Sequence, residues 1–267
     1  MCAVIPRLKA PVSRKMITLE VRERVNLSPN FASVTLGGPE LKDLVVTGAD
    51  QTVRLFFPRE GQRGLRMPTF SNETWMPELM LLPKSVRPWV RTLTIRRARP
   101  ADDEVDIEFA LHGNSPMSEW VRRVRPGDPA GIFDMGTTYR PPDDVGGQLV
   151  VADESALPAA LAILDGAPES LAAQVFLEVP TAADIRRYDT TDGVHWLSRD
   201  DPGLRPGTLA LEAVQRASLP HGRFYTWVAG ESRLATSLRR HLVSERGAAK
   251  ADISFAGYWR HGWSSPG

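Results

Sequence analysis

A short segment in the first half of the chain carries residue types suited to holding an anion beside a polar ring. It reads Arg91, Thr92, Leu93, Thr94. Because side chains alternate along a strand, Thr92 and Thr94 share one face and Arg91 and Leu93 share the other. The planar fork of an arginine can grip a pyrophosphate, and a threonine hydroxyl both donates and accepts at the edge of a heteroaromatic ring. The same four residues also suit an ordinary surface strand, so alone they specify little.

A second segment has the pattern of a strand that runs into a helix. It contains His112 and Gly113, then Ser115 at the N-cap position, and Met117 and Ser118 in the first turn. Free backbone N–H groups and the positive end of the helix dipole make such a turn an anion site, and a diphosphate fits there. Taken alone, the pattern is explained more simply by a capped helix without any ligand.

Two further segments follow apolar strands in the second half. Ligands bind at the carboxyl ends of parallel strands, which is where these residues fall. No Gly-x-Gly-x-x-Gly fingerprint is present, and proline near the helix start is compatible with capping alone. The candidate residues are Asp153, Glu154, Ser155, Ala156, Gly230 and Glu231.

The end of the chain gathers aromatic and basic residues. Tyr258, Trp259, Arg260 and His261 lie on or just after a terminal strand. Such residues can pack on a flat ring or meet an anionic ligand, although packing in the core is the simpler interpretation of a Tyr-Trp pair taken alone.

Alternating patterns predict the strands that must position the first two segments. One face of 104–112 carries Val105, Ile107 and Phe109, against Asp106 and Glu108 on the other. Short alternating strands separated by Gly and Pro predict an antiparallel barrel or sandwich. We expect a helix from Ser115 and a long Pro-rich loop over 58–90. The expected strands are 16–22, 31–36, 53–58, 90–98, 104–112 and 131–135.

After the turn-rich run 141–147 the pattern changes to alternating strands and helices, which predicts a parallel sheet covered on both faces. The fold class is therefore a two-domain α+β chain: an antiparallel β-barrel over 14–142 followed by an α/β domain over 147–267. This order is that of ferredoxin–NADP reductases, in which the barrel holds flavin and the α/β domain nicotinamide; so far this is an analogy of fold. The expected strands are 148–153, 174–179, 194–198, 224–230 and 252–259, and the expected helices 155–166, 209–218 and 232–247.

Composition narrows the function further. Thirty-three basic residues nearly cancel 32 acidic ones, so a net charge of +1 gives no overall attraction to nucleic acid or anionic membrane. The one cysteine, Cys2, rules out an intrachain disulfide and a Cys-rich metal site, which is typical of a reducing compartment. We see no signal peptide and no run of about 20 apolar residues that would span a membrane.

Taken in order and spacing, these motifs resemble one family, the siderophore-interacting, FAD-binding proteins. That family carries Arg-x-Tyr-Thr-x-Arg, Leu-His-Gly, Gly-Pro-Ala-Ser-x-Trp, Pro-Gly-Asp, Asp-Glu-Thr-Ala-Leu-Pro-Ala, Ala-Gly-Glu and Tyr-Trp-Arg-x-Gly. The counterparts here are 91–96, 111–113, 115–120, 126–128, 153–159, 229–231 and 258–262. Each motif is weak, but the ordered set covers the chain from about residue 14. The departures are Leu93 for the family tyrosine, Ser115 for glycine and Ser155 for threonine.

The resemblance implies bound FAD, with NADPH or NADH as electron donor, and no nucleophile or general base. It implies FAD contacts from Arg91, Thr92, Leu93, Thr94, His112, Gly113, Ser115, Met117, Ser118 and Trp259. It implies nicotinamide contacts from Asp153, Glu154, Ser155, Ala156, Gly230 and Glu231. Leu93 can cover a flavin face but lacks the aromatic stacking and phenol hydrogen bond of tyrosine.

The resemblance also implies the substrate, a ferric siderophore reduced to release Fe(II) in the cytoplasm, and we expect a monomer. Arg54 stands where the family has a basic residue, usually lysine, and the terminal motif that the family brings near the flavin contains Arg260 and His261. Together these three would form a cationic mouth for an anionic siderophore. Otherwise Arg54 is a solvated strand charge and Arg260 an ordinary ion-pair partner.

Three alternatives remain open from the sequence. Reduced ferredoxin replaces nicotinamide as donor in some members of the family, and Asp153 and Glu231 do not distinguish the two. A siderophore- or flavin-binding protein without turnover is favoured by Leu93. A general flavin reductase or the partner of an oxygenase is the third.

Overall fold

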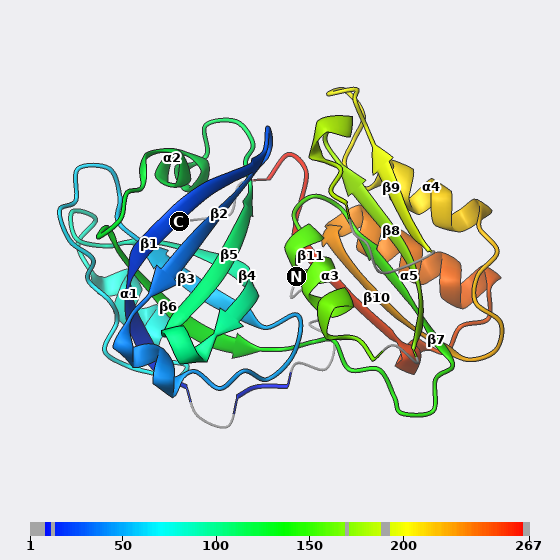
Figure 1. The fold of residues 1–267 in the computed structure, drawn as a ribbon, viewed down its shortest axis with the longest axis horizontal. Helices are drawn as coiled ribbons and strands as arrows, with labels where there is room; N and C mark the ends of the chain where they lie inside the picture. The colour runs from blue at the N-terminus through cyan, green and yellow to red at the C-terminus, as the bar shows by residue number, and fades with distance from the viewer. Residues whose placement is uncertain (1–8, 12–13, 169–170, 188–192, 264–267) are drawn as a thin grey trace. The chain divides into compact units, whose positions relative to one another are not determined.

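The computed structural model describes residues 9–11, 14–168, 171–187 and 193–263, which divide into two compact units (Figure 1). Lys9 to Thr137 belong to one, which we call the barrel unit. The residues from Thr138 onward belong to the other, which we call the α/β unit. Cys2 lies outside the described residues.

Six antiparallel strands of the barrel unit form a closed barrel in the order β1-β2-β5-β4-β3-β6. The first strand closes the barrel by pairing with the last, so that Met16 lies opposite Phe133. All six expected strands are present. They are β1 Met16–Ser28, β2 Phe31–Gly37, β3 Thr52–Phe57, β4 Trp89–Arg99, β5 Glu104–Ala110 and β6 Pro129–Gly136.

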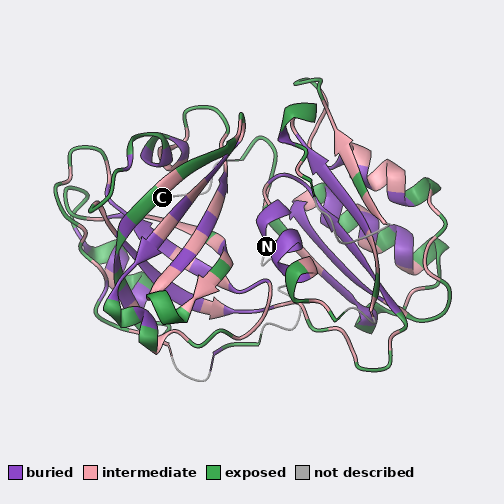
Figure 2. Ribbon diagram, viewed as in Figure 1, coloured by how far each residue is buried: buried purple, intermediate pink, exposed green. Residues whose placement is uncertain are grey.

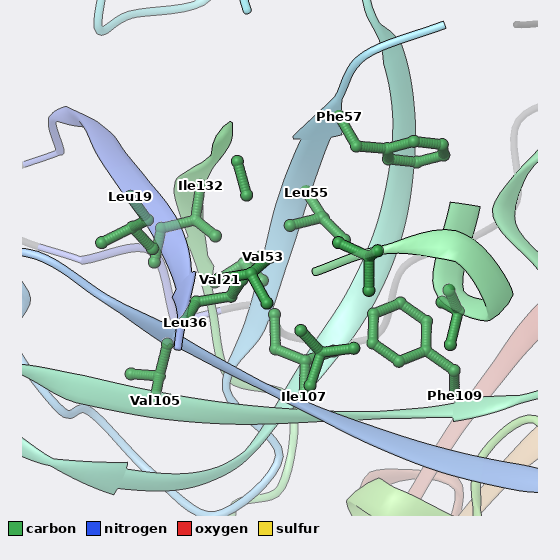
Figure 3. Close-up of a cluster of buried hydrophobic side chains, with 14 of the residues drawn as sticks. Leu19, Val21, Leu36, Val53, Leu55, Phe57, Val105, Ile107, Phe109 and Ile132 are labelled. Atoms are coloured by element: carbon green, nitrogen blue, oxygen red, sulfur yellow. The ribbon is translucent and has the colours of Figure 1, made fainter. Parts of the chain in front are cut away.

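The inward-facing residues of these strands form one apolar core (Figure 3). On β5, Val105, Ile107 and Phe109 are at most 1% exposed, while Asp106 and Glu108 alternate with them on the outer face. Each such side chain stabilises the fold by about 1.5–3 kcal/mol through burial. The alternation read from the sequence is thus the alternation of the barrel wall.

The barrel unit also holds two α-helices, α1 Trp75–Leu81 and α2 Pro116–Arg123, and two 3-10 turns, η1 Pro39–Asp43 and η2 Pro100–Asp102. Helix α2 begins where the sequence predicts. The prediction of a continuous loop over 58–90 is wrong, because α1 lies within it. Trp75 and Leu79, one turn apart, are buried against Phe56 and Phe133. Flanking prolines mask this short helix in the sequence.

The α/β unit is built on a parallel sheet in the order β11-β10-β7-β8-β9. Its strands are β7 Gly147–Ala152, β8 Ala172–Val179, β9 Val194–Ser198, β10 Phe224–Glu231 and β11 Ile253–Trp259. Its helices are α3 Leu157–Gly166, α4 Thr208–Arg216 and α5 Ser232–Glu245, with 3-10 turns η3 Ala182–Asp184 and η4 Lys250–Asp252. Helices α4 and α5 cover one face and α3 the other (Figure 1).

Because both faces are covered, the central strands are mostly apolar, and their polar residues, such as Gln148 and Thr226, are buried as well. All six residues of β7 are buried, and Figure 2 shows β7 and its neighbours as buried ribbon. The predicted fold class, an antiparallel barrel followed by a parallel α/β sheet, is confirmed. No helix within the described part of the chain is long and apolar enough to cross a membrane.

Candidate functional site

Strands β3 and β4 pair antiparallel and fix the faces of the first candidate segment. Arg91 lies opposite Leu55 and Leu93 opposite Val53, and both β3 residues are fully buried in the barrel core. Directly opposite residues of such a pair point to the same face. Arg91 and Leu93 nevertheless remain partly exposed, although Leu93 also packs against the core. Part of each side chain is therefore open to a ligand.

The opposite face of β4 carries the two threonines, as strand alternation requires. Thr92 is exposed and lies opposite Arg54, whose Nη1 donates to its Oγ1. Thr94 is only 6% exposed. Burial lowers the pKa of Arg54, and its Nε is buried with no hydrogen-bond partner among the described residues. Arg54 is thus a half-buried cation tied to the candidate segment.

Arg91 shares an indole ring with a second arginine that the sequence analysis missed. Its Nη1 donates to the carbonyl of Val90 at 2.7 Å, and its Cζ lies 5.1 Å from the centroid of the Trp89 ring. The Cζ of Arg59 lies 3.7 Å from the same centroid. Burial, and then the positive charge of Arg59, lower the pKa of Arg91. The signal in the sequence that could have indicated part of this arrangement is strand alternation, which places Trp89 on the same face as Arg91.

The second candidate segment folds as the capped start of α2. Ser115 Oγ accepts from the N–H of Ser118 at 3.2 Å, and Ser118 Oγ donates to the carbonyl of His112 at 3.2 Å. Ser118 is fully buried and Met117 packs against the barrel core, whereas His112 and Gly113 are exposed. The structure brings all five candidates into one turn. Its serine hydroxyls bond within the turn, and its exposed members are His112 and Gly113.

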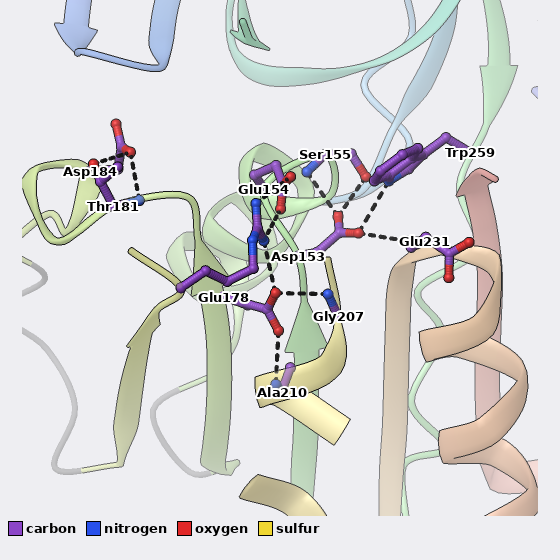
Figure 4. Close-up of polar contacts among 11 residues, drawn as sticks. Asp153, Glu154, Ser155, Glu178, Thr181, Asp184, Gly207, Ala210, Glu231 and Trp259 are labelled. Carbon is purple, nitrogen blue, oxygen red and sulfur yellow. Dashed lines mark hydrogen bonds and ion pairs between the residues drawn. The ribbon is translucent and has the colours of Figure 1, made fainter. Parts of the chain in front are cut away.

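Asp153 is the centre of the candidate site in the α/β unit (Figure 4). Its Oδ1 accepts from the N–H and Oγ of Ser155 at 2.9 and 2.6 Å. Its Oδ2 accepts from the N–H of Glu231 at 2.6 Å and from Nε1 of Trp259 at 3.1 Å. Burial, followed by the charge of Glu154, raises the pKa of Asp153 to about 7, against the hydrogen bonds from Ser155 and Glu231. The carboxyl group is fully buried and does not reach solvent.

Glu154 is held by an ion pair. Arg199 donates to both of its carboxylate oxygens, at 2.7 and 2.8 Å, and to Glu178 at 2.8 Å. Glu178, at the end of β8, also accepts from the N–H groups of Gly207 and Ala210, so it caps the start of α4. Burial opposes the charge of Arg199, but the bonds to Glu154 and Glu178 raise its pKa. Arg199, which follows β9, thus links Glu154, which follows β7, to Glu178 on β8.

Glu231 has a similar internal role at the end of β10. It is fully buried and caps α5, since it accepts from the N–H of Arg233 at 2.6 Å. It also accepts from Arg205 Nη2 at 2.7 Å and from the N–H of His261 at 3.1 Å. Burial opposes its ionisation, but the hydrogen bond from Arg205 and then those from His261 and Arg233 lower its pKa.

The terminal motif lies at this same edge of the sheet. Trp259 bonds to Asp153, its carbonyl accepts from Ser232 Oγ at 2.7 Å, and its ring meets that of His261 edge-on at 6.1 Å. The exposed Arg260 lies over the Trp263 ring at 4.8 Å. The structure therefore brings together residues that the sequence placed in separate groups.

The side chains predicted to contact nicotinamide shape the edge of their own sheet. The carboxylates of Asp153, Glu154 and Glu231 are satisfied within the α/β unit, and Ala156 is fully buried at the start of α3. Contact with nicotinamide stays a prediction for this set. Glu178, Arg199 and Arg205 complete the network but lie far from the motifs in sequence, so no local signal marked them.

Comparison with known proteins extends over both units. Residues 20–138 match the family model of the siderophore-interacting FAD-binding domain, and residues 145–262 match that of the siderophore-interacting protein. The chain belongs to the siderophore-interacting protein family. The family that the motifs resemble is thereby confirmed, as is FAD as the cofactor of its barrel domain.

Relatives of this siderophore-interacting protein include two named reductases. The ferric vibriobactin reductase ViuB of Vibrio cholerae is 28% identical over 97% of this chain and 91% of its own. The NADPH-dependent ferric-chelate reductase of Escherichia coli is 25% identical, with 92% of each chain covered. A crystal structure of a siderophore utilization protein from T. fusca is 29% identical, with a TM-score of 0.82 over 96% of this chain and 97% of that one.

The expected ferredoxin-reductase type of fold is also confirmed. The ferredoxin reductase of carbazole 1,9a-dioxygenase superposes with a TM-score of 0.65 at 15% identity, over 93% of this chain and 71% of that one. At this identity the likeness concerns the fold alone.

The barrel unit of this siderophore-interacting protein suits FAD. Among the described residues, neither Arg59 nor Arg91 has a carboxylate partner, so both cations are available to an anion such as a diphosphate. Leu93, at the position of the family tyrosine, is partly exposed on the face of Arg91.

Proposed function

We propose that this protein is an FAD-dependent ferric-siderophore reductase that takes electrons from NADPH or NADH and releases iron as Fe(II) in the cytoplasm. The observation that carries the proposal is the partly exposed guanidinium of Arg91, without an acidic partner in the described chain, in a barrel that matches an FAD-binding domain. The activities named for the Vibrio cholerae and Escherichia coli relatives support the reaction, and the latter supports NADPH as donor.

The chain's residues would bind and orient the cofactor. Arg91 would hold the diphosphate with its planar fork, and N–H groups of the turn between His112 and Ser118 would add donors to the same anion. Leu93 would cover one face of the flavin ring, and Thr92 would donate to its edge. When bound, FAD accepts an electron pair from the donor and passes single electrons to Fe(III).

The role of the protein toward its substrate would be to bind the iron complex. Fe(II) carries less charge than Fe(III), so hard anionic oxygen ligands hold it less tightly and the metal leaves. Arg54, Arg260 and His261 would attract the anionic complex. Arg54 is held by Thr92 in the barrel unit, and Arg260 is exposed in the α/β unit, with no carboxylate partner in the described ranges for either.

An anaerobic reduction assay tests the proposal. Protein loaded with FAD is mixed with a ferric siderophore and a ferrozine-type Fe(II) trap, with NADPH, NADH or reduced ferredoxin as the donor in separate cuvettes. We expect the yellow flavin to bleach and Fe(II) to appear with a nicotinamide donor. Fe(II) with ferredoxin alone would correct the donor. A flavin-loaded protein that reduces no iron with any donor would instead be a binding protein.

A further inference from the structure

The indole ring of Trp89 carries two guanidinium groups. Arg59 stacks at 3.7 Å from the ring centroid and Arg91 lies at 5.1 Å. Trp89 itself lies opposite Phe57 and packs against the barrel core, so its position is set by the core. Two cations on one anchored ring are fixed with respect to each other.

The backbone holds Arg59 in this position. Its Nε donates to the carbonyl of Arg87 at 2.8 Å, and its own N–H donates to Gln62 Oε1 at 2.9 Å. Gln62 in turn donates to the carbonyls of Ser85 and Arg87. These bonds use one of the five side-chain donors of Arg59 and leave the four on its terminal nitrogens for another partner.

Two other half-buried arginines of the barrel unit, Arg96 and Arg99, are neutralised by carboxylates. Arg99 bonds to Glu104 and Asp106, and Arg96 pairs with Glu108 at 3.5 Å. Neither Arg59 nor Arg91 has an acidic partner among the residues that the structure describes. Burial and then the charge of Arg87 lower the pKa of Arg59, as burial and the charge of Arg59 do for Arg91. Like charges held together and partly desolvated favour an anion between them.

Arg87 differs from the other two because its side chain already has partners. Its guanidinium donates to the carbonyls of Met80 and Leu82, which end helix α1. The helix missed in the sequence therefore engages one arginine of the three, and Arg59 and Arg91 stay available.

We propose that Arg59, held on Trp89, binds the diphosphate of FAD together with Arg91, so that the two arginines form a clamp for the phosphates. This inference rests on the proposed FAD site and adds to it a residue outside the family motifs. Two planar forks match the oxygens of a diphosphate better than one, because each can bind bidentately. The clamp would contact the phosphates and not the flavin ring.

Equilibrium binding to the apo-protein tests the clamp, with FAD and riboflavin as the two probes followed by flavin fluorescence. We expect Arg59→Gln to weaken FAD about 10- to 100-fold, as for loss of a charge-assisted contact, and to leave riboflavin within about twofold. Arg59→Lys should fall between, since it keeps the charge without the fork. The FAD affinity of the wild type should fall with added salt more steeply than that of Arg59→Gln.

Arg22→Gln is the matched control, because it removes an exposed barrel cation whose only ion-pair partner among the described residues is the exposed Glu20. Circular dichroism and melting temperature verify that each variant folds. Unchanged FAD affinity in Arg59→Gln would overturn the clamp while the proposed function stands. Equal losses for FAD and riboflavin would overturn it too, because Arg59 would then support the ring or the fold. A wild type that binds no FAD would remove the proposed function itself.

Discussion

Gly230 lies directly against the carboxyl group of Asp153. A Cβ built on this glycine would sit 2.5 Å from the carboxyl carbon of Asp153 and 2.7 Å from both oxygens. The glycine also has φ of +138°, a conformation that other residues rarely adopt. Glycine at the end of β10 is therefore what allows the next residue, Glu231, to donate its N–H to the buried acid.

Gly230→Ala should destabilise the α/β unit by several kcal/mol, because the strain of its backbone, roughly 1–3 kcal/mol, adds to a contact that no rotation relieves. Gly222→Ala is the matched control, since Gly222 has φ of +76° but nothing within 4 Å of its Cβ. Urea unfolding of both variants separates the clash from the strain. Equal losses would contradict the clash.

Asp153 should make stability fall as pH rises. Its folded pKa of about 7 lies above the usual value of about 3.9, so between these the native state retains a proton that the unfolded state has lost. The stabilisation is complete below about pH 4 and lost through pH 7, with a total of roughly 4 kcal/mol. Unfolding free energies of the wild type at pH 5 and 8 should differ, and Asp153→Asn should flatten the difference. Parallel pH profiles would show that another group is responsible.

Arg199→Ala should be strongly destabilising, by about 3–5 kcal/mol, because it leaves Glu154 and Glu178 as buried charges without their cation. Arg216→Ala serves for comparison, since it breaks an exposed pair with Glu212, worth about 0.3–0.5 kcal/mol. Thermal unfolding measures the loss of stability in both variants. A small effect at Arg199 would mean that water replaces the pair.

Leu93→Tyr should tighten FAD binding. A ring at this partly exposed position adds a stacking surface worth roughly 0.5–1.5 kcal/mol beyond the area it buries. The dissociation constant of FAD is the measurement. Because Leu93 also packs against the barrel core, unchanged or weaker binding would show that the larger side chain turns away from the flavin.

Arg54→Gln and Arg260→Gln should each raise the KM for an anionic ferric siderophore and flatten its salt dependence, with FAD retained. The single variants test the barrel unit and the α/β unit separately. Wild-type kinetics at low salt in both variants would place the substrate site elsewhere.

The sequence predicts strands and helices well where the burial of one face, or a capping residue, sets a local pattern of residue types. The strand that holds Val105, Ile107 and Phe109 and the helix capped by Ser115 follow from local chemistry. The sequence does not predict helix α1, because Trp75 and Leu79 are buried by contacts with segments elsewhere in the chain.

The candidate site divides in the same way. Motifs locate Arg91 and Asp153, because each stands at a recognisable strand. The partners that define the chemistry of these segments come from distant positions: Arg59 shares a ring with Arg91 in one unit, and Arg199 pairs with Glu154, next to Asp153, in the other. Pairing across such separations depends on the folded chain, and the pattern of a single segment cannot reveal it.

The pairing of β1 with β6 has a consequence for synthesis. A nascent chain cannot close its barrel until residue 136 has left the ribosome, since the first strand waits for the last. No ladder between named strands of the described chain joins the two units, so closure needs nothing made later. The first half should therefore mature co-translationally. A chain that stalls within β6 would expose two unpaired sheet edges, a product prone to aggregation.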